Sequence, residues 1–341
     1  MGYRYIGNKT RLADRLYDII RRYIRPESRI ADPMCGTAAV SAKFRQESHQ
    51  VIAGDLMHYS GHHARTRLLL DEPPQFPSIG LDYHGVLEYL NQEVKPLKSL
   101  FFNEYSPGGT PIAGTPPRKY FTPENAMKID GILKQLSDWE ASMPAIEISV
   151  LRHDLILAVN SISNIAGTYG HYRSTFSRGS MKSLELTPSK FAPGRTDHVV
   201  SVGPADRTLA EHSADAVYLD PPYKKRQYAA NYHILETIAR GDSPTPTGVS
   251  GLRNWWPEYS DFCSKLKIAQ AFHSVFEASD APIFFISYSE DGLIPDSKMR
   301  EILEHHGTVT RHELKHSRFK SNSAGVGGML DEYLYVVQRS S

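Results

Sequence analysis

The sequence predicts an α/β fold, in which a doubly wound, Rossmann-like sheet is interrupted by a largely helical and loop-rich insertion. A short strand, Arg29–Ala31, runs through a small-residue loop into a helix-like stretch from Ala38 to Glu47, which is the opening of a nucleotide-binding unit. Four strand-like runs each lead to an aspartate. A long stretch with helical periodicity separates the second run from the third, so we assign 1–70 and 199–341 to the sheet domain and 71–198 to the insertion.

The composition is that of an ordinary folded enzyme. Hydrophobic residues make up 40% of the 341 and charged residues 23%, and the chain contains no apolar run long enough for a membrane span. The N-terminus lacks the apolar stretch of a signal peptide, and two cysteines, Cys35 and Cys263, form no disulfide framework, so we expect a cytoplasmic protein. Because the net charge is only +1, a polyanionic partner would have to meet local positive charge.

The N-terminal part begins with a loop, Tyr5-Ile6-Gly7-Asn8-Lys9, that places a cation just before a helix predicted over 10–25 with Thr10 as its N-cap. The alternative for Lys9 is a solvated surface lysine. The next loop, Asp32-Pro33-Met34-Cys35-Gly36, has one glycine where a dinucleotide fingerprint has three. We therefore expect a ligand without phosphate groups at this loop.

The four aspartates at the ends of strand-like runs are Asp32, Asp55, Asp206 and Asp220. In a parallel sheet they would gather at one carboxyl edge, where ligands bind in this architecture, and Asp55 is placed to take the hydroxyls of a ribose. Any one of them alone could equally be a helix cap. Together they favour a binding site.

The insertion contains two helices whose apolar stripes indicate core. One follows the capping pair Thr122-Pro123, and the other runs from about 146 to 166 with Gly167 as its stop. The segment 168–195 differs, because rings and cations alternate in it, as contact with phosphates and bases requires. Its candidate nucleic-acid-binding residues are Tyr169, Tyr172, Arg173, Arg178 and Lys182. An ordinary surface loop is the alternative.

The stretch Ala216–Leu219 reads as a buried strand, and it ends in Asp220-Pro221-Pro222-Tyr223. The prolines stiffen the backbone where it leaves the sheet, so Asp220 and the Pro221 carbonyl can accept the hydrogens of an exocyclic amine while Tyr223 stacks on its ring. The alternative is a strand that merely ends in a proline turn. Cations and a ring follow at Lys224, Arg226 and Tyr228, where they could contact a backbone phosphate.

Further along, 241–257 is predicted to be a loop whose Trp255 and Trp256 are expected to form a hydrophobic plug, with a stacking platform as the alternative. Buried strands are predicted at Pro282–Tyr288 and Tyr333–Val337, separated by a basic, glycine-rich loop at His316–Gly328. We expect no metal: His58, His62 and His63 lie close in sequence, but adjacent histidines point to different helix faces and no cysteine joins them.

Four motifs, in this order along the chain, resemble the Dam-like adenine-specific DNA methyltransferases: the Tyr5–Lys9 loop, Asp32–Gly36, Asp55 and Asp220–Tyr223. The stretches Arg226-Gln227-Tyr228 and Ile286-Ser287-Tyr288-Ser289 resemble the restriction-modification branch of that family. The chain departs from the usual pattern at three positions: Met34 stands in place of phenylalanine, Ala38 in place of a second glycine, and Lys224 in place of asparagine.

This resemblance implies an S-adenosylmethionine-dependent methyltransferase sheet with an inserted target-recognition region. Lys9 and Asp32 would lie near the methionine moiety, Asp55 at the ribose and Asp206 at the adenine amine of the cofactor. The cofactor-binding set is then Tyr5, Lys9, Asp32, Pro33, Met34, Gly36, Asp55 and Asp206, and the catalytic set is Asp220, Pro221, Pro222 and Tyr223.

The resulting prediction is a methyltransferase that acts on the N6 amine of an adenine flipped out of double-stranded DNA at a specific site. A cognate restriction endonuclease is a second expected partner. The alternatives are methylation of another amine, on cytosine, RNA or a protein glutamine, and a catalytically silent DNA-binding module of the same fold. A nicotinamide oxidoreductase is disfavoured because the three-glycine fingerprint is missing.

Overall fold

The computed structural model describes residues 5–112, 114–317 and 329–339. These residues form two compact units, each built from segments that are distant in sequence. The helical unit contains the described N-terminal residues up to Ile6, together with Leu70–Pro193 and Tyr228–Glu258. The sheet unit contains Gly7–Leu69, Gly194–Gln227 and the described residues from Tyr259 onward.

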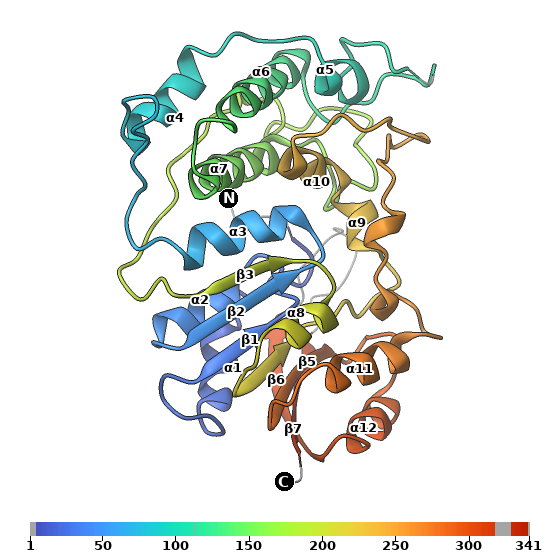
Figure 1. Ribbon diagram of the computed structural model, residues 1–341. Helices are drawn as coiled ribbons and strands as arrows, with labels where there is room; N and C mark the ends of the chain where they lie inside the picture. Colours follow the sequence, from blue (N-terminus) through green and yellow to red (C-terminus); the bar gives the residue numbers. More distant parts are fainter. Residues whose placement is uncertain (1–4, 113, 318–328, 340–341) are drawn as a thin grey trace. The chain divides into compact units, whose positions relative to one another are not determined.

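The sheet unit is built on one sheet with the strand order β3-β2-β1-β4-β5-β7-β6 (Figure 1). The first five strands in this order are parallel, and β7 runs antiparallel to both of its neighbours. Because the chain proceeds outward from β1 in both directions, the switch point lies between β1 and β4. This confirms the predicted doubly wound fold. The strands are β1 Arg29–Asp32, β2 Gln50–Asp55, β3 Val199–Val202, β4 Ala216–Leu219, β5 Ile283–Ser289, β6 Thr308–Ser317 and β7 Met329–Gln338.

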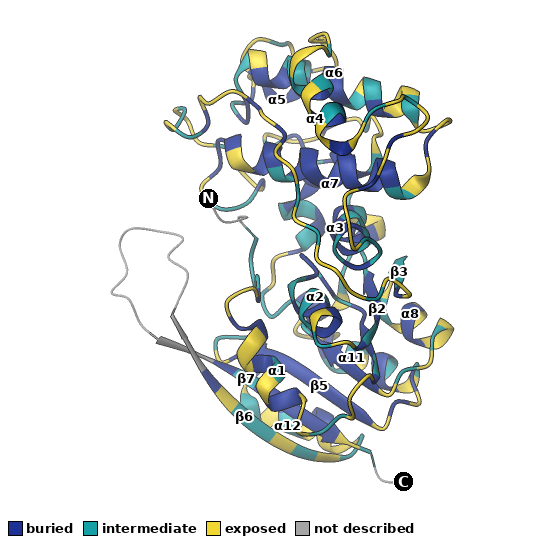
Figure 2. Ribbon diagram, turned by 90° about the vertical axis from the view of Figure 1, so that its left-hand side faces the viewer, coloured by how far each residue is buried: buried dark blue, intermediate teal, exposed yellow. Residues whose placement is uncertain are grey.

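Helices cover both faces of this sheet. Side chains that alternate along the strands point into two apolar clusters, one on each face. The first cluster includes α1 (Ala13–Ile20), α2 (Ala39–Gln46) and α3 (His58–Leu68), and the second includes α8 (Ala205–Glu211), η2 (Asp261–Cys263), α11 (Ile268–Glu277) and α12 (Asp296–Glu304). Strand β5 is buried along its whole length, as Figure 2 shows, because both faces are covered.

The helical unit packs α4 (Tyr83–Gln92), α5 (Leu100–Tyr105), α6 (Pro123–Trp139), α7 (Ala145–Ile162), α9 (Tyr228–Asn231), α10 (His233–Arg240) and the short η1 (Trp256–Glu258). The segment Tyr228–Glu258, which the sequence assigned to the sheet domain, belongs to this unit by its contacts. One reason is Arg152 of α7, whose buried guanidinium donates to the carbonyl oxygen of Ile238 at 2.6 Å.

Several expected element ends differ from the observed ones. The helix predicted over 10–25 is only Ala13–Ile20, and Thr10 is not its N-cap, because the Asn8 side chain accepts from the Thr10 amide in a turn before the helix. Helix α7 stops at Ile162, before the expected Gly167. The sequence did not predict α4 or α5. No helix among the described residues combines the length and the apolar character that crossing a membrane requires.

Candidate active site at the carboxyl edge of the sheet

Three of the predicted aspartates lie at the same edge of the sheet. Asp32 is the last residue of β1, Asp55 is the last of β2, and Asp220 directly follows β4. Since β1 pairs in parallel with β2 on one side and with β4 on the other, these ends are neighbours. Burial raises the pKa of the Asp32 carboxyl group, and the negative charges of Asp220 and Asp55 raise it further, so the three acids are coupled electrostatically.

Lys9 joins this edge through two ion pairs. Its Nζ lies 3.0 Å from Asp220 Oδ1 and 2.7 Å from Glu332 Oε1, and the Ser287 hydroxyl donates to the same glutamate oxygen at 2.7 Å. The Lys9 and Glu332 side chains are 6% and 7% exposed, whereas that of Asp220 is 17% exposed. Asp220 is therefore the member of this cluster that a ligand can reach. The alternative of a solvated Lys9 is wrong.

The pKa values in this cluster follow from burial opposed by charge. Burial lowers the pKa of Lys9, but the carboxylates of Asp220 and Glu332 outweigh it and hold that pKa well above its ordinary value. Burial raises the pKa of Asp220 to about 6, with Lys9 acting in the opposite direction and Glu332 adding to the rise. Asp220 is thus mostly ionised at neutral pH, with Lys9 beside it.

Asp32 is the most unusual carboxyl group of the site. It is 1% exposed, and burial raises its pKa to about 7 even though the Ser41 hydroxyl donates to Oδ2 at 2.5 Å. Its other oxygen, Oδ1, is buried without a hydrogen-bond partner within 3.5 Å, and the Met34 backbone amide is the smallest of the influences on this pKa, which it lowers. A buried acceptor of this kind normally has a partner, so the atom is suited to a donor that arrives with a ligand.

The loop after β1 is held by the acid that ends β2. Asp55 accepts from the backbone amides of Gly36 at 2.8 Å and Met57 at 2.9 Å, and the Cys35 amide donates to Gly54 at 2.9 Å. Gly36 has φ 52°, where glycine is favoured. Ala38, which stands where the resembled family often has glycine, also has a positive φ of 57°. The sequence departure thus falls on a position where the backbone itself favours glycine.

The tetrapeptide after β4 places a ring beside the acid. Pro221 is buried, and Pro222 and Tyr223 are half-buried. Lys9 Nζ lies 5.6 Å from the centre of the Tyr223 ring, which meets the Tyr288 ring edge-to-face at 6.3 Å. Burial raises the pKa of Tyr223 to about 12, so its hydroxyl stays protonated. Tyr288 comes from β5, in the stretch Ile286–Ser289 that the sequence singled out.

The remaining predicted cofactor residues lie in different surroundings. Pro33 is buried and Met34 is half-buried against the apolar cluster under β4 and β5. Asp206 does not end a strand as expected: it is an exposed residue in the first turn of α8 and accepts from the Arg207 amide. Tyr5 belongs to the helical unit, where its ring stacks on Tyr232 at 4.9 Å.

The predicted DNA-binding residues of the helical unit fall into two groups. Tyr169 is fully buried, and its hydroxyl donates to Asn160 Oδ1 at 3.2 Å, so this ring is a core residue and is not available to stack on a base. Arg173, Arg178 and Lys182 are exposed. Tyr172 is half-buried against Tyr120, and Tyr228 lies in α9 and donates to the Ile6 carbonyl.

Two predicted DNA contacts lie in the sheet unit. Lys224 forms an ion pair with Asp291 at 2.6 Å and also donates to the Asp291 carbonyl at 2.7 Å, so its charge is already engaged. Arg226 is exposed. In the loop 241–257, Trp255 and Trp256 stack on each other at 4.7 Å and Trp256 is 67% exposed, so the plug interpretation is wrong for Trp256. Most of the predicted loop His316–Gly328 lies outside the described residues.

Sequence reasoning missed Glu332, Ser287 and Ser41 as site residues. The local signal for Glu332 was an acid directly before the apolar run Tyr333–Val337, where a buried charge is costly unless it is paired. Its pairing partner is more than three hundred residues away in sequence. Nothing local could have identified that partner.

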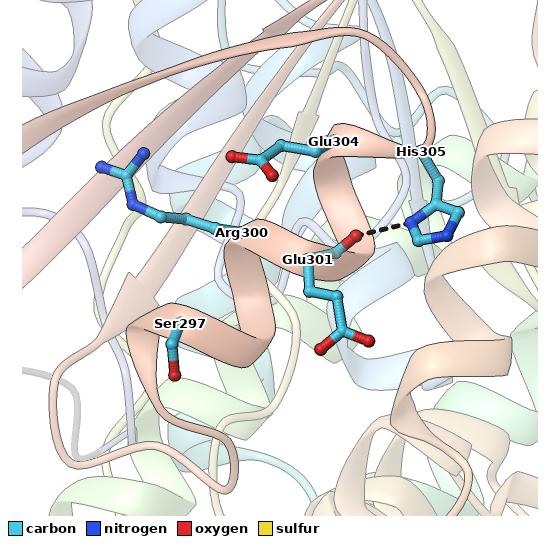
Figure 3. A pocket seen from close by; sticks show the side chains of 5 residues that line it. All are labelled: Ser297, Arg300, Glu301, Glu304 and His305. Atoms are coloured by element: carbon cyan, nitrogen blue, oxygen red, sulfur yellow. Dashed lines mark hydrogen bonds between the residues drawn. The ribbon is translucent and has the colours of Figure 1, made fainter.

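A surface pocket elsewhere in the sheet unit does not compete with this edge. It is lined by Ser297, Arg300, Glu301, Glu304 and His305, all from α12 and the residue that follows it (Figure 3). None of the predicted site residues lines it. Within the described part of the chain, no three His, Cys, Asp or Glu side chains are grouped so that they could hold a metal ion. His58, His62 and His63 lie on α3, where His63 is buried.

Comparison with known proteins agrees with this geometry. The family described as "D12 class N6 adenine-specific DNA methyltransferase" matches residues 5–302. The chain is 30% identical to the type II methyltransferase M.NlaIII of Neisseria lactamica, over 98% of this chain and 99% of that protein. It is 29% identical to M.CviAII of Paramecium bursaria Chlorella virus 1, over 98% and 97% respectively.

A third relative is longer than this chain. The chain is 30% identical to the type II methyltransferase M.FokI of Planomicrobium okeanokoites over 98% of its own length, but it spans only about half (52%) of that protein. The match of the family over most of the sequence, together with the full-length similarity to M.NlaIII, is decisive. The chain belongs to the D12 class N6 adenine-specific DNA methyltransferases.

Proposed function

We propose that the carboxyl edge of the sheet is the active site of this DNA adenine methyltransferase and that Asp220-Pro221-Pro222-Tyr223 holds an adenine flipped out of double-stranded DNA at a specific sequence. The observation that carries this proposal is the buried cluster in which Lys9 and Glu332 lie behind Asp220 and leave it as the reachable acid. A carboxylate presented in this way is suited to accept hydrogens from an amine.

The residues at this edge fit S-adenosylmethionine. That molecule has a cationic ammonium and a sulfonium, and the edge offers the carboxyl groups of Asp32 and Asp55, with Asp32 Oδ1 lacking a hydrogen-bond partner within 3.5 Å. We propose that Asp32, Pro33, Met34 and Gly36 hold the methionine part, together with Lys9. Asp55 would take the ribose hydroxyls and Asp206 the adenine amine. The bound cofactor supplies an electrophilic methyl group.

The side chains of this site then act on the substrate amine. The lone pair of an exocyclic adenine amine is delocalised into the ring, so the amine is a weak nucleophile until it pyramidalises. Asp220 and the Pro221 carbonyl accept its hydrogens and stabilise the positive charge that the amine gains, which is an interaction stronger in the transition state than in the ground state. Tyr223 replaces the stacking that the base loses when it leaves the duplex. Alignment of the amine with the methyl group supplies much of the remaining rate.

The test is the pair Asp220→Ala and Asp261→Ala, in which the second removes an exposed acid of the sheet unit. Asp220→Ala is expected to lower transfer of labelled methyl groups to DNA by at least about a thousandfold while cofactor affinity, measured by calorimetry, survives. Asp261→Ala keeps full activity. Methyl transfer that persists in Asp220→Ala refutes the assignment.

Digestion of the labelled DNA to nucleosides identifies the methylated base. N6-methyladenine is expected, and label on cytosine would mean that the amine clamp serves another base. Methyl transfer by the wild type in the same preparations would exclude the catalytically silent binding module, because that module would bind DNA and transfer no methyl group.

We also propose a cognate restriction endonuclease that cuts at the methylated site. The proposal is supported by the names of the relatives, which are type II and modification methyltransferases. Base-resolved mapping of methylated adenines in cells that express the chain would give the recognition sequence. DNA methylated at that sequence should then resist an endonuclease specific for it, and cleavage at the unmodified rate would contradict the proposal.

A further inference from the structure

A small hairpin in the helical unit has an unusually well-anchored tip. Thr247 and Leu252 exchange two backbone hydrogen bonds of 2.8 Å, and the residues between them, Gly248-Val249-Ser250-Gly251, turn the chain with φ 68° at both glycines. None of the candidate site residues of the sequence analysis lies in this loop.

Three of the four tip residues, Gly248, Val249 and Gly251, have carbonyl groups that accept hydrogen bonds from buried side chains. Arg118, which is 0% exposed, donates from Nε to Val249 at 2.9 Å and from Nη2 to Gly248 at 3.0 Å. Tyr105 donates to the Gly251 carbonyl at 2.9 Å. The Tyr120 hydroxyl lies 3.1 Å from the Ser250 carbonyl, but its single hydrogen is donated to the nearer Tyr169 carbonyl at 2.7 Å. The tip thus has three carbonyls that accept from buried side chains.

Arg118 is fully occupied in holding this tip. Its other donors bind the Glu104 carbonyl at 3.0 Å, Glu104 Oε2 at 2.7 Å and Thr115 Oγ1 at 3.0 Å, so all five N–H groups of the guanidinium have acceptors. A buried pair of this kind is costly to assemble, and its stability contribution relative to apolar residues is small or negative. What it supplies here is a fixed conformation of the tip.

The fixed carbonyls determine where the amides point. In a trans peptide the C=O of one residue and the N–H of the next point in opposite directions. Because Arg118 binds the carbonyls of Gly248 and Val249, the amides of Val249 and Ser250 face away from this buried side chain. Neither of these two amides donates to an acceptor in the part of the chain that the structure describes. Successive amides that face the same way bind anions.

The surroundings favour a polyanion as the occupant. The Ser250 hydroxyl donates to the Gly170 carbonyl at 2.7 Å, which fixes the tip beside the segment 168–174, where His171 and Arg173 are exposed. Neither this segment nor the hairpin contains an acidic residue. Gly248 and Val249 are exposed, Val249 to 65%, so the tip is open to solvent.

We propose that the hairpin tip Gly248–Ser250 grips a backbone phosphate of the substrate DNA through these amides, an inference that rests on the proposed function. The contact is with the phosphodiester and not with a base, because amides that all donate can bind any phosphate and carry no sequence information.

The test uses charge at position 249. Val249→Glu places a carboxylate beside the bound phosphate and is expected to weaken DNA binding at least about tenfold, equally for DNA with and without the recognition sequence. Val249→Gln, of similar size, is expected within about twofold of the wild type, and Val249→Lys is expected to bind at least as tightly as the wild type. Leu266→Glu, at a 95% exposed position of the sheet unit, is the matched control and should bind like the wild type.

A second measurement locates the phosphate. Single neutral methylphosphonates are placed along the substrate, and affinities are measured by fluorescence anisotropy. When the methylphosphonate replaces the phosphate that the tip binds, the wild type should lose affinity for the DNA. At that position the Val249→Glu variant and the wild type should then bind equally well. Melting temperature and cofactor affinity are unchanged in every variant, which excludes a folding defect.

Three results would overturn the inference: a Val249→Glu variant that binds like Leu266→Glu, a penalty confined to DNA with the recognition sequence, or a penalty that survives every methylphosphonate position. Methyl transfer by the wild type in the same preparations separates this failure from failure of the proposed function. If the wild type transfers methyl groups to DNA, only the hairpin inference falls.

Discussion

At the scale of single residues, the site depends on one lysine shared between two acids. Glu332 forms an ion pair with Lys9 at 2.7 Å and accepts a hydrogen bond from Ser287. These two contacts fix the Lys9 ammonium independently of Asp220. Burial raises the pKa of Asp220 and Glu332 adds to the rise, whereas the charge of Lys9 lowers it. Lys9 thereby keeps the acceptor ionised at the pH where it has to work.

This arrangement predicts a pH dependence. Asp220 accepts amine hydrogens only when ionised, so activity should fall as the pH drops through the pKa of Asp220, which burial raises to about 6 in the free protein. Replacement of Lys9 by Met removes the charge that lowers this pKa, and the acid limb of kcat/KM is expected to move to higher pH, in addition to any loss of rate. The measurement is kcat/KM between about pH 5 and 9 for both proteins.

The control for this profile is Lys298→Met, which removes an exposed lysine of α12. Its acid limb should coincide with that of the wild type. An acid limb that stays in place in Lys9→Met would show that another group controls the profile.

At the scale of elements, the ends of helices are decided by contacts that lie outside the helix. Asp130 of α6 accepts from the amides of Ser99, Phe101 and Phe102 at 2.8 to 2.9 Å, and so caps the start of α5 from another helix. The helix propensity of Leu100–Tyr105 cannot reveal this cap, because the carboxylate belongs to a residue outside the segment. This is why α5 could not be predicted, whereas α6, with its own Thr122 cap, could.

Helix α2 ends in a Schellman arrangement without the usual glycine. The His49 amide donates to Phe44 and the Ser48 amide donates to Arg45, both at 3.0 Å, while the exposed Ser48 has φ 67°. Ser48→Gly is expected to stabilise the protein by up to about 1 kcal/mol, because a side chain in the left-handed region is strained.

Thermal unfolding of Ser48→Gly and Ser48→Ala checks this prediction. Alanine keeps the strain and should leave the melting temperature near that of the wild type, whereas glycine should raise it. Equal melting temperatures for the two variants would mean that the strain is absent.

At the scale of the whole molecule, the predicted cofactor residues, apart from Tyr5, lie in the sheet unit, whereas most predicted DNA contacts lie in the helical unit. Arg178 and Lys182 are exposed cations of the helical unit. Their distance in the chain from the strand ends suggests that binding of the two substrates can be separated by mutation.

The double variant Arg178→Ala, Lys182→Ala is expected to weaken DNA binding while cofactor affinity stays unchanged. If both contact phosphates, the slope of log K against log salt concentration should fall in magnitude by about 2. Anisotropy titrations at several salt concentrations measure it, with Lys298→Ala of the sheet unit as the control. An unchanged slope would remove both residues from the DNA interface.

The sequence by itself determined the doubly wound sheet, the ends of β1, β2 and β4, and three of the acids at its carboxyl edge. A strand that is buried on both faces and ends in an acid or a proline can be predicted locally. Its hydrophobic pattern and its turn residues are both visible in consecutive residues. The resemblance to the adenine methyltransferases rested on short motifs of the same local kind.

Only the tertiary structure decided which of these residues are available for chemistry. In the structure Lys9 forms an ion pair with Glu332, and Lys224 forms one with Asp291. Tyr169 is buried, and Asp206 lies in the first turn of a helix. The tertiary structure also assembled the hairpin tip over Arg118. Each of these outcomes depends on a partner remote in sequence or on burial by several elements at once, and neither is encoded in the neighbouring residues.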